Sequence, residues 1–266
     1  MLFTMVIQVI TSILHEIIRL TMMRYFFSAF LLLLAASSIH GQSERKFEKP
    51  DYATIERLTK DISAAAYYPK LFSRYQHNDT TLTDRDFMLL YYGYFFQSGY
   101  KQSGVRSAIE DSVNAINNKG SGMTTDEMKR MIRLTQRELK RSPFDLEYIN
   151  ALCNMQQMLG NNDSLIIYLY KLKMIARTLC ASGDGLTEPT AIHVLMVSDE
   201  YSILHLLGFD FDGIKSRTAG YCDYLKVKKN NDGIDGFYFD VSEIQAMQHK
   251  TGKAGEKSQK GLTGKR

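Results

Sequence analysis

The spacing of hydrophobic residues changes once along the chain, near Gly183. Before this glycine, hydrophobic residues recur every three or four positions, which is typical of amphipathic helices. After it, segments such as YCDYLKVKK alternate hydrophobic and polar residues, which is typical of strands. The same spacing of hydrophobic residues cannot give one buried face in both structures, because the direction of the side chains repeats every 3.6 residues in a helix and every 2 in a strand. The sequence therefore predicts an α+β fold, with a helical body at residues 43–182 and a strand-rich cap at residues 183–248 packed on the helices.

Capping motifs divide the helical body into short, paired helices. Thr124 and Glu127 have the spacing of a capping box, and Ser142–Pro143 is predicted to cap and begin the following helix. Residues 159–172, LGNNDSLIIYLYKL, resemble the turn and second helix of a tetratricopeptide repeat. No second copy is found at the period of about 34 residues, so the sequence predicts paired, tetratricopeptide-like helices without indicating an array.

The cap is expected to contain a small antiparallel sheet of about three strands. A short helix that begins with Asp199 and Glu200 separates the first two strands. The predicted strands are TAIHVLMVSD at 190–199, YCDYLKVKK at 221–229 and DGFYFDVS at 235–242.

Two segments of the cap are rich in Asp, Asn and Gly, and both are predicted to be loops. Asn231–Gly233 lies between two strand patterns and favours a hairpin turn, since Asn and Gly accept a positive φ. If Gly233 took the sixth position of a calcium loop, Lys228 and Phe239 would occupy positions that need carboxylates. The second segment, FDFDG at residues 209–213, offers too few ligands for a metal site.

The N-terminal region has the layout of a secretory signal peptide over residues 22–42. Arg24 precedes an apolar run, and small and polar residues follow that run. The run is shorter than the ~20 residues of a membrane span. Residues 1–21 are predicted to be an upstream extension, with a membrane-anchored N-terminus as the alternative. Because no cysteine follows the apolar run directly, we expect export without a lipid anchor and without a stable membrane span after cleavage.

The formal net charge of +4 is concentrated at the C-terminal end of the chain. Residues 249–266 contain six Lys or Arg and one acidic residue, with almost nothing to bury, and are predicted to be a disordered basic tail. A nucleic-acid surface would instead place its basic residues on a folded face. We therefore expect no nucleic-acid partner.

The sequence lacks the usual motifs of nucleophilic, phosphate-binding and metal sites. No GxSxG, Gly-rich phosphate loop or HExxH is present, so neither a cofactor nor a metal is predicted. Cys153, Cys180 and Cys222 could provide one disulfide and a free thiol, or three buried thiols.

Asp199, Glu200 and Tyr201 follow a predicted strand and begin a predicted helix, a position that often carries function. One hypothesis makes Asp199 and Glu200 the acid and base of a hydrolase of unfamiliar type. The alternative is that Ser198 or Asp199 caps the helix and Glu200 interacts with its dipole.

The segment LLYYGYFF, residues 89–96, carries hydrophobic residues around most of a helix circumference, which indicates burial. It also offers more aromatic area than one buried face needs. Tyr91, Tyr92 and Tyr94 could line a binding groove, with Tyr201 as a further binding residue, or they could belong to the core.

Several segments together resemble an uncharacterised family, domain of unknown function 4919, over residues 50–245. These segments are YYPKLFSRYQHNDTTLT, LLYYGYFFQSGY, SGDGLTEPTAIHVLMVSDEYSILHLLGF and YCDYLKVKKNNDGIDGFYFDV. The resemblance implies an exported, periplasmic or extracellular protein of a Gram-negative bacterium of the Bacteroides type. It implies no activity and no catalytic residues.

Two functions from different classes are consistent with the sequence. The first is an exported binding or scaffolding protein, with an envelope protein or peptide as its partner, because paired helices form concave surfaces. The second is the hydrolase that would use Asp199 and Glu200. We expect the first, and therefore a protein that is not an enzyme.

Overall fold

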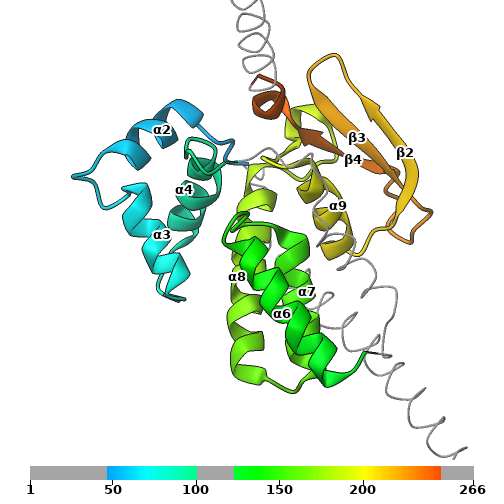
Figure 1. The fold of residues 1–266 in the computed structure, drawn as a ribbon. Coiled ribbons are helices and arrows are strands. Elements are labelled where there is room, and N and C mark those ends of the chain that lie inside the picture. Colours follow the sequence, from blue (N-terminus) through cyan, green and yellow to red (C-terminus); the bar gives the residue numbers. More distant parts are fainter. Residues whose placement is uncertain (1–46, 101–122, 247–266) are drawn as a thin grey trace, which may run out of the picture. The chain divides into compact units, whose positions relative to one another are not determined.

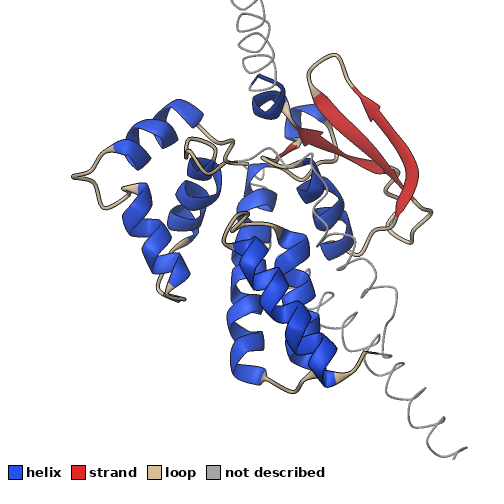
Figure 2. Cartoon of the chain, in the orientation of Figure 1, coloured by secondary structure: helices blue, strands red, loops and turns tan. Residues whose placement is uncertain are grey.

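The computed structural model describes residues 47–100 and 123–246 (Figure 1). The predicted extension, signal peptide and basic tail, at residues 1–21, 22–42 and 249–266, lie outside the described residues. Within the described residues, no helix combines the length and the hydrophobicity that crossing a membrane requires. All strands of the described part follow Gly183, as the change of period predicts (Figure 2).

Of the first three described helices, two begin at side-chain caps, and the other has a proline in its first turn. The three helices are α2 (Tyr52–Lys60), α3 (Tyr68–Gln76) and α4 (Asp84–Tyr94). Thr83 and Asp86 form a reciprocal capping box at the start of α4, which satisfies two backbone N–H groups that the helix leaves free.

Three longer helices follow and pack consecutively against one another. They are α6 (Thr125–Leu139), α7 (Leu146–Met158) and α8 (Asn162–Ser182). The capping box of Thr124 and Glu127 is confirmed. The start of α7 differs from the prediction, because Ser142 and Pro143 lie in the preceding turn. Asp145 caps α7 instead, and its carboxylate accepts a hydrogen bond from the Tyr148 N–H. A tetratricopeptide geometry for these pairs stays a prediction.

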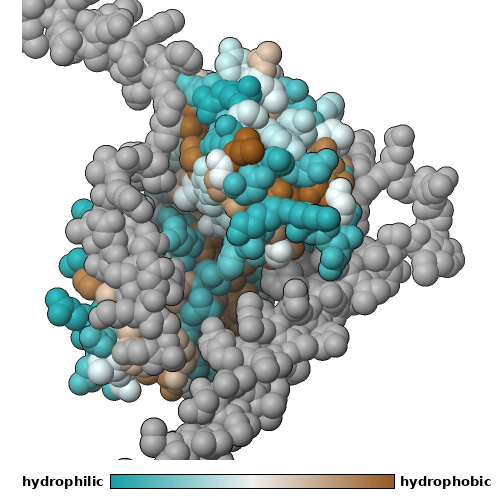
Figure 3. Space-filling view, turned by 90° about the vertical axis from the view of Figure 1, so that its right-hand side faces the viewer, coloured by the Kyte–Doolittle hydropathy of each residue, from teal (hydrophilic) through white to brown (hydrophobic). Residues whose placement is uncertain are grey.

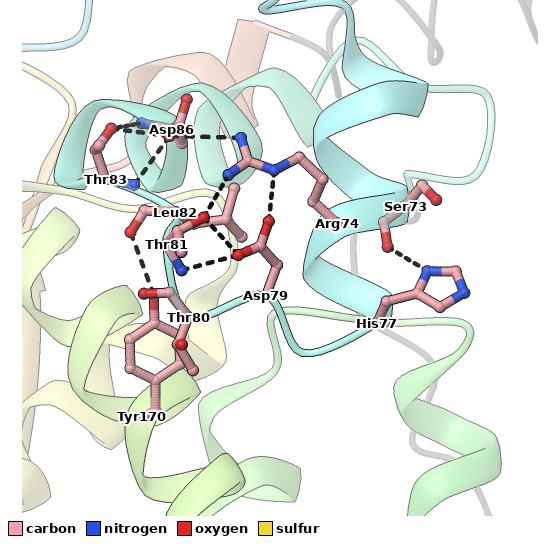
Figure 4. A network of polar contacts seen from close by, with 10 residues as sticks. All are labelled: Ser73, Arg74, His77, Asp79, Thr80, Thr81, Leu82, Thr83, Asp86 and Tyr170. Carbon is pink, nitrogen blue, oxygen red and sulfur yellow. Dashed lines mark hydrogen bonds and ion pairs between the residues drawn. The ribbon is translucent and has the colours of Figure 1, made fainter.

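Tyr170 of α8 connects this group of helices to the turn between α3 and α4 (Figure 4). Its hydroxyl donates to the carbonyl of Leu82 at 3.2 Å. Within the turn, Arg74 donates to the carboxylate of Asp79 at 2.7 Å and to the hydroxyl of Thr81 at 3.0 Å. The turn is therefore fixed from both sides.

The C-terminal part contains a four-stranded mixed sheet, in place of the three antiparallel strands expected. The strand order is β1-β4-β3-β2, with β1 parallel to β4 and the other neighbours antiparallel. Its elements are η2 (Glu188–Thr190), β1 (Ile192–His193), α9 (Val197–Leu206), β2 (Phe211–Arg217), β3 (Cys222–Val227) and β4 (Gly236–Asp240).

Two strand predictions need correction. The strand expected at 190–199 is only the two residues of β1, because helix α9 begins at Val197. The first three residues of β2, at 211–213, were expected to belong to a loop, and the irregularity of the strand explains this. Its pairing with β3 shifts register between Phe211 and Lys215, and Gly213 adopts a φ of +96°. A bulge of this kind breaks the alternation on which strand prediction depends.

The turn between β3 and β4 confirms the interpretation of the Asn-Asp-Gly segment. Gly233 has a φ of +68°, and the strands on either side pair antiparallel. Asn230 closes the turn with its side chain, which accepts from the Ile234 N–H at 3.1 Å and donates to the Ile234 carbonyl at 2.7 Å.

One hydrophobic core joins the helices to the sheet. Leu90 of α4 and Ile175 of α8 belong to the same buried cluster as Leu225 of β3 and Phe239 of β4. Phe144 lies at the centre of its aromatic part, in edge or tilted contact with Tyr75, Tyr91 and Tyr94, among others.

Candidate functional site

Three tyrosine hydroxyls hold the backbone between β1 and α9. Tyr92 of α4 donates to the carbonyl of His193 at 3.1 Å, and Tyr100 donates to the carbonyl of Leu195 at 2.6 Å. The hydroxyl of Tyr91 accepts from the Leu195 N–H at 3.0 Å. Buried backbone groups that have no place in a helix or sheet need such partners.

The binding groove expected at Tyr91, Tyr92 and Tyr94 is therefore wrong, and the core interpretation describes these residues. All three side chains are buried. The hydroxyl of Tyr94 is also used internally, since it donates to the carbonyl of Arg141 at 2.9 Å. Helix α4 packs against α2, α3 and α8, which explains why its apolar residues surround the helix.

Asp199 lies in the first turn of α9, next to the backbone segment that these tyrosines hold. We call this segment, together with Tyr91, Tyr92, Tyr100 and Asp199, the junction. Its Oδ2 accepts a short hydrogen bond from the hydroxyl of Tyr91, whereas its Oδ1 has no hydrogen-bond partner within the described residues. The side chain is fully buried, and burial raises its pKa well above the usual value. Burial therefore disfavours the charged form of Asp199.

Glu200, the next residue, faces a group of charges on the sheet. Lys215 of β2 donates to Glu200 Oε2 and to Asp223 Oδ2, each at 2.7 Å. Arg217 binds both oxygens of Asp223, at 2.6 and 3.0 Å. Two acids and two bases thus form a compact ionic cluster between α9, β2 and β3.

The two acids of this cluster differ in their pKa values. Burial raises the pKa of Glu200 to about 7, although the hydrogen bond from Lys215 opposes the shift. Burial also acts on Asp223, but there the hydrogen bonds from Arg217 and Lys215 outweigh it and lower the pKa. Asp223 therefore carries the stable negative charge, and Glu200 titrates near neutral pH.

Tyr201 is the one predicted binding residue that reaches the surface, with 38% of its area exposed. Its ring meets the ring of Phe211 edge-on, with centroids 5.3 Å apart. The ammonium group of Lys215 lies 5.7 Å from the centre of the Tyr201 ring, within the range of a cation–π contact.

The structure brings most of the predicted site residues together around the start of α9. Tyr91 and Asp199 share a hydrogen bond, while Glu200 and Tyr201 both contact Lys215. The alternative that Ser198 or Asp199 caps α9 is wrong, because Met196 is the N-cap and makes no side-chain capping bond, whereas Glu200 does lie in the first turn of the helix.

Sequence reasoning missed Lys215, Arg217 and Asp223 as members of this site. Lys215 and Arg217 stand two residues apart, so they lie on the same face of a strand. Asp223 pairs with Arg217 across the β2–β3 ladder. The alternating cations were the available signal, and recognising them required knowing that this segment is a strand.

The junction is closed, which limits its chemistry. Neither Asp199 nor Glu200 exposes any surface, and the described residues contain no group of His, Cys, Asp and Glu suited to holding a metal. The three cysteines are all free. Burial raises the pKa of the Cys153 thiol to about 12 and that of Cys222 to about 11, so both stay protonated near neutral pH.

The fold and the junction define an α+β protein whose helical part and sheet share one core and one buried polar network. The family model described as Domain of unknown function (DUF4919) matches residues 53–250, which is most of the chain. The chain belongs to this family. Neither a curated protein nor a solved structure matches it.

We predict that Tyr91→Phe lowers the free energy of unfolding by about 1–3 kcal/mol, because Asp199 Oδ2 and the Leu195 N–H lose a buried partner. Urea unfolding measures this change. The matched control is Tyr168→Phe, whose hydroxyl accepts a hydrogen bond from the exposed side chain of Gln136, and it should change stability by less than about 0.5 kcal/mol. Equal effects of the two variants would contradict the role given to Tyr91.

We predict that Glu200 makes stability fall as pH rises from about 4.5 to about 7. In this window the folded chain keeps the Glu200 proton and the unfolded chain loses it, because the pKa rises from 4.5 to about 7 on folding. Relative to Glu200→Gln, the wild-type chain should lose about 1–3 kcal/mol between pH 5 and pH 8. Urea unfolding at several pH values checks this, and parallel stability curves for both chains would refute it.

Proposed function

We propose that the protein is an exported binding protein of the bacterial envelope whose partner is a protein or peptide. Export rests on the signal-peptide layout of residues 22–42 and gives the protein a periplasmic or extracellular location. The binding role rests on one observation: the aromatic ring of Tyr201 is exposed and is supported by contacts with Phe211 and Lys215.

The surroundings of Tyr201 have the composition of a protein-binding surface. Tyr and Arg are enriched among residues that dominate binding energy, and a rigid ring loses little entropy on binding. Arg217 on β2, which shares Asp223 with Lys215, has more than half of its side chain exposed. Figure 3 shows the side of the molecule that carries the sheet, where hydrophilic side chains lie next to hydrophobic patches.

The ionic cluster beneath Tyr201 supports recognition because it holds the surface residues in place. Lys215 is fixed by Glu200 and Asp223, so it can support the Tyr201 ring without losing further freedom when a partner binds. The exposed guanidinium of Arg217 favours a partner segment that presents a carboxylate. We therefore expect a partner with an apolar side chain next to an acidic group.

The hydrolase is the second candidate, and one observation favours it. The pKa of Glu200, about 7, suits a general acid or base near neutral pH. However, a catalytic carboxylate must reach its substrate, and both Asp199 and Glu200 are fully buried. The buried position makes this the weaker proposal.

We predict that Tyr201→Ala weakens binding to the partner recovered from envelope extracts by at least about 2 kcal/mol, or roughly thirtyfold. The control is Tyr221→Ala, which removes an equally large exposed ring from the turn between β2 and β3. Affinity is measured by titration with the purified partner. Equal affinities of Tyr201→Ala and the wild-type chain would remove Tyr201 from the binding surface.

Glu200→Gln tests the hydrolase in the same preparation. We predict that hydrolysis of a broad panel of glycosides, esters and peptides stays at the background rate in both chains, because Glu200 has no access to a substrate. A wild-type rate above background with an inflection near pH 7, abolished by Glu200→Gln, would establish the hydrolase instead.

A further inference from the structure

Helix α6 (green in Figure 1) carries a row of exposed cations on the side opposite its buried face. The cations spread over about 100° of the helix circumference and about 17 Å of its length. Met131 and Ile132 lie on the other side and pack against residues of α7. The row, which we call the cationic face, consists of Lys129, Arg130, Arg133, Arg137 and Lys140, the last being the C-cap residue.

The side chains of the cationic face have no partner in the described part of the chain. Within residues 47–100 and 123–246, none of the five forms an ion pair. Cations on other helices are paired: Lys60, Arg74 and Arg177 each contact an acid, at 2.5, 2.7 and 2.6 Å. The charge of the cationic face is thus left for something outside these residues.

The cationic face is unfavourable for the helix that carries it. Lys129, Arg133 and Arg137 follow one another at intervals of four residues, and like charges at this spacing destabilise a helix. The helix dipole favours cations only in the last turn, so it accounts for Arg137 and Lys140 but not for the other three. A surface that is charged only for solubility mixes both signs. The unpaired row therefore points to an anionic partner.

The rest of the protein carries the opposite charge. Outside residues 123–141, the described residues contain 21 Asp or Glu and 14 Lys or Arg, whereas residues 123–141 contain three and six. An extended anionic surface would attract α6 and would on average repel the remainder. The distribution of charge thus determines which side of the protein turns towards such a surface.

We propose that the cationic face of α6 docks the protein on a membrane surface that carries anionic phospholipid headgroups. Along α6, no large hydrophobic side chain is exposed, so this face lacks the apolar or aromatic anchor that dominates binding to another protein. It also lacks the aromatic rings on which nucleobases stack. A flat array of lipid phosphates needs neither, because it attracts each nearby Lys or Arg through charge alone.

The inference goes beyond the proposed binding role, because none of the five cations belongs to the surface around Tyr201. The choice of a membrane over duplex nucleic acid rests on the proposed export, which brings the protein next to the membranes of the envelope. Each Lys or Arg near an anionic lipid surface strengthens binding about fivefold, and salt screens the attraction beyond about 10 Å. Docking should therefore be peripheral, reversible and sensitive to salt.

Co-sedimentation of the purified full chain with lipid vesicles tests the proposal. The vesicles consist of phosphatidylcholine alone or with about one third phosphatidylglycerol, which supplies the anionic headgroups. We predict that the wild-type chain binds the anionic vesicles more tightly than the neutral ones, and that about 0.5 M salt abolishes the difference. Equal binding to both kinds of vesicle at low salt would overturn the proposal.

Removal of two cations from the row tests the assignment to α6. Arg133→Gln with Arg137→Gln should weaken binding to the anionic vesicles about 25-fold. The Tm should stay unchanged or rise, because repulsion between like charges along the helix is relieved. The matched control, Lys228→Gln with Lys229→Gln, removes the same charge from exposed positions after β3 and should weaken binding less than about threefold. An equal loss in the two double variants would show attraction to net charge alone and would overturn the proposal.

Further comparisons separate this proposal from other sources of binding. Residues 1–42 and 249–266 are identical in every variant, so their contribution cancels. Tyr201→Ala should bind the vesicles like the wild-type chain, so a failure of the Tyr201 surface can be distinguished from a failure of membrane docking. Tighter binding to double-stranded DNA or to polyglutamate at the same salt concentration, lost when Arg133 and Arg137 are replaced, would make that polymer the partner and would overturn docking on a membrane.

Discussion

The structure depends on tyrosine hydroxyls that satisfy backbone groups far away along the chain. Tyr91, Tyr92 and Tyr100 hold the segment before α9, and Tyr75 donates to the carbonyl of Pro143 at 2.8 Å. Each ring fills the core while its hydroxyl replaces the water that the connection would otherwise need. The hydroxyl of Tyr91 also accepts from the Leu195 N–H, a role that an indole could not fill because it offers a donor but no acceptor.

Local features were predictable, and partners distant in sequence were not. The capping boxes at Thr83 and Thr124 depend on residues three positions apart, so they could be recognised directly. The change of period at Gly183 also placed the strands correctly, since all strands of the described part follow it. Strand β2 escaped prediction because its bulge at Gly213 interrupts the alternation, and without β2 the sheet has three strands instead of four.

The candidate site was likewise predictable only in its local features. The position of Asp199 and Glu200 beside a helix start could be read from the sequence, and the structure places them at the junction of α4, α9 and the sheet. Their environments could not be predicted from the sequence. Lys215 of β2 forms an ion pair with Glu200 of α9, and the position of β2 is set by its pairing with β3. Burial, which decides whether a carboxylate can meet a substrate, is a property of the assembled core.

The bulge in β2 has a consequence for the solubility of the sheet. β2 is one of the two outer strands of the sheet, and a long, straight outer strand is a template on which further chains can add and polymerise. Here the register shift leaves only a short regular ladder beyond Lys215, and that stretch carries two cations. A second chain would find few aligned hydrogen-bonding groups there. The register shift that made β2 difficult to predict from the sequence thus also disfavours aggregation of the folded protein through this strand.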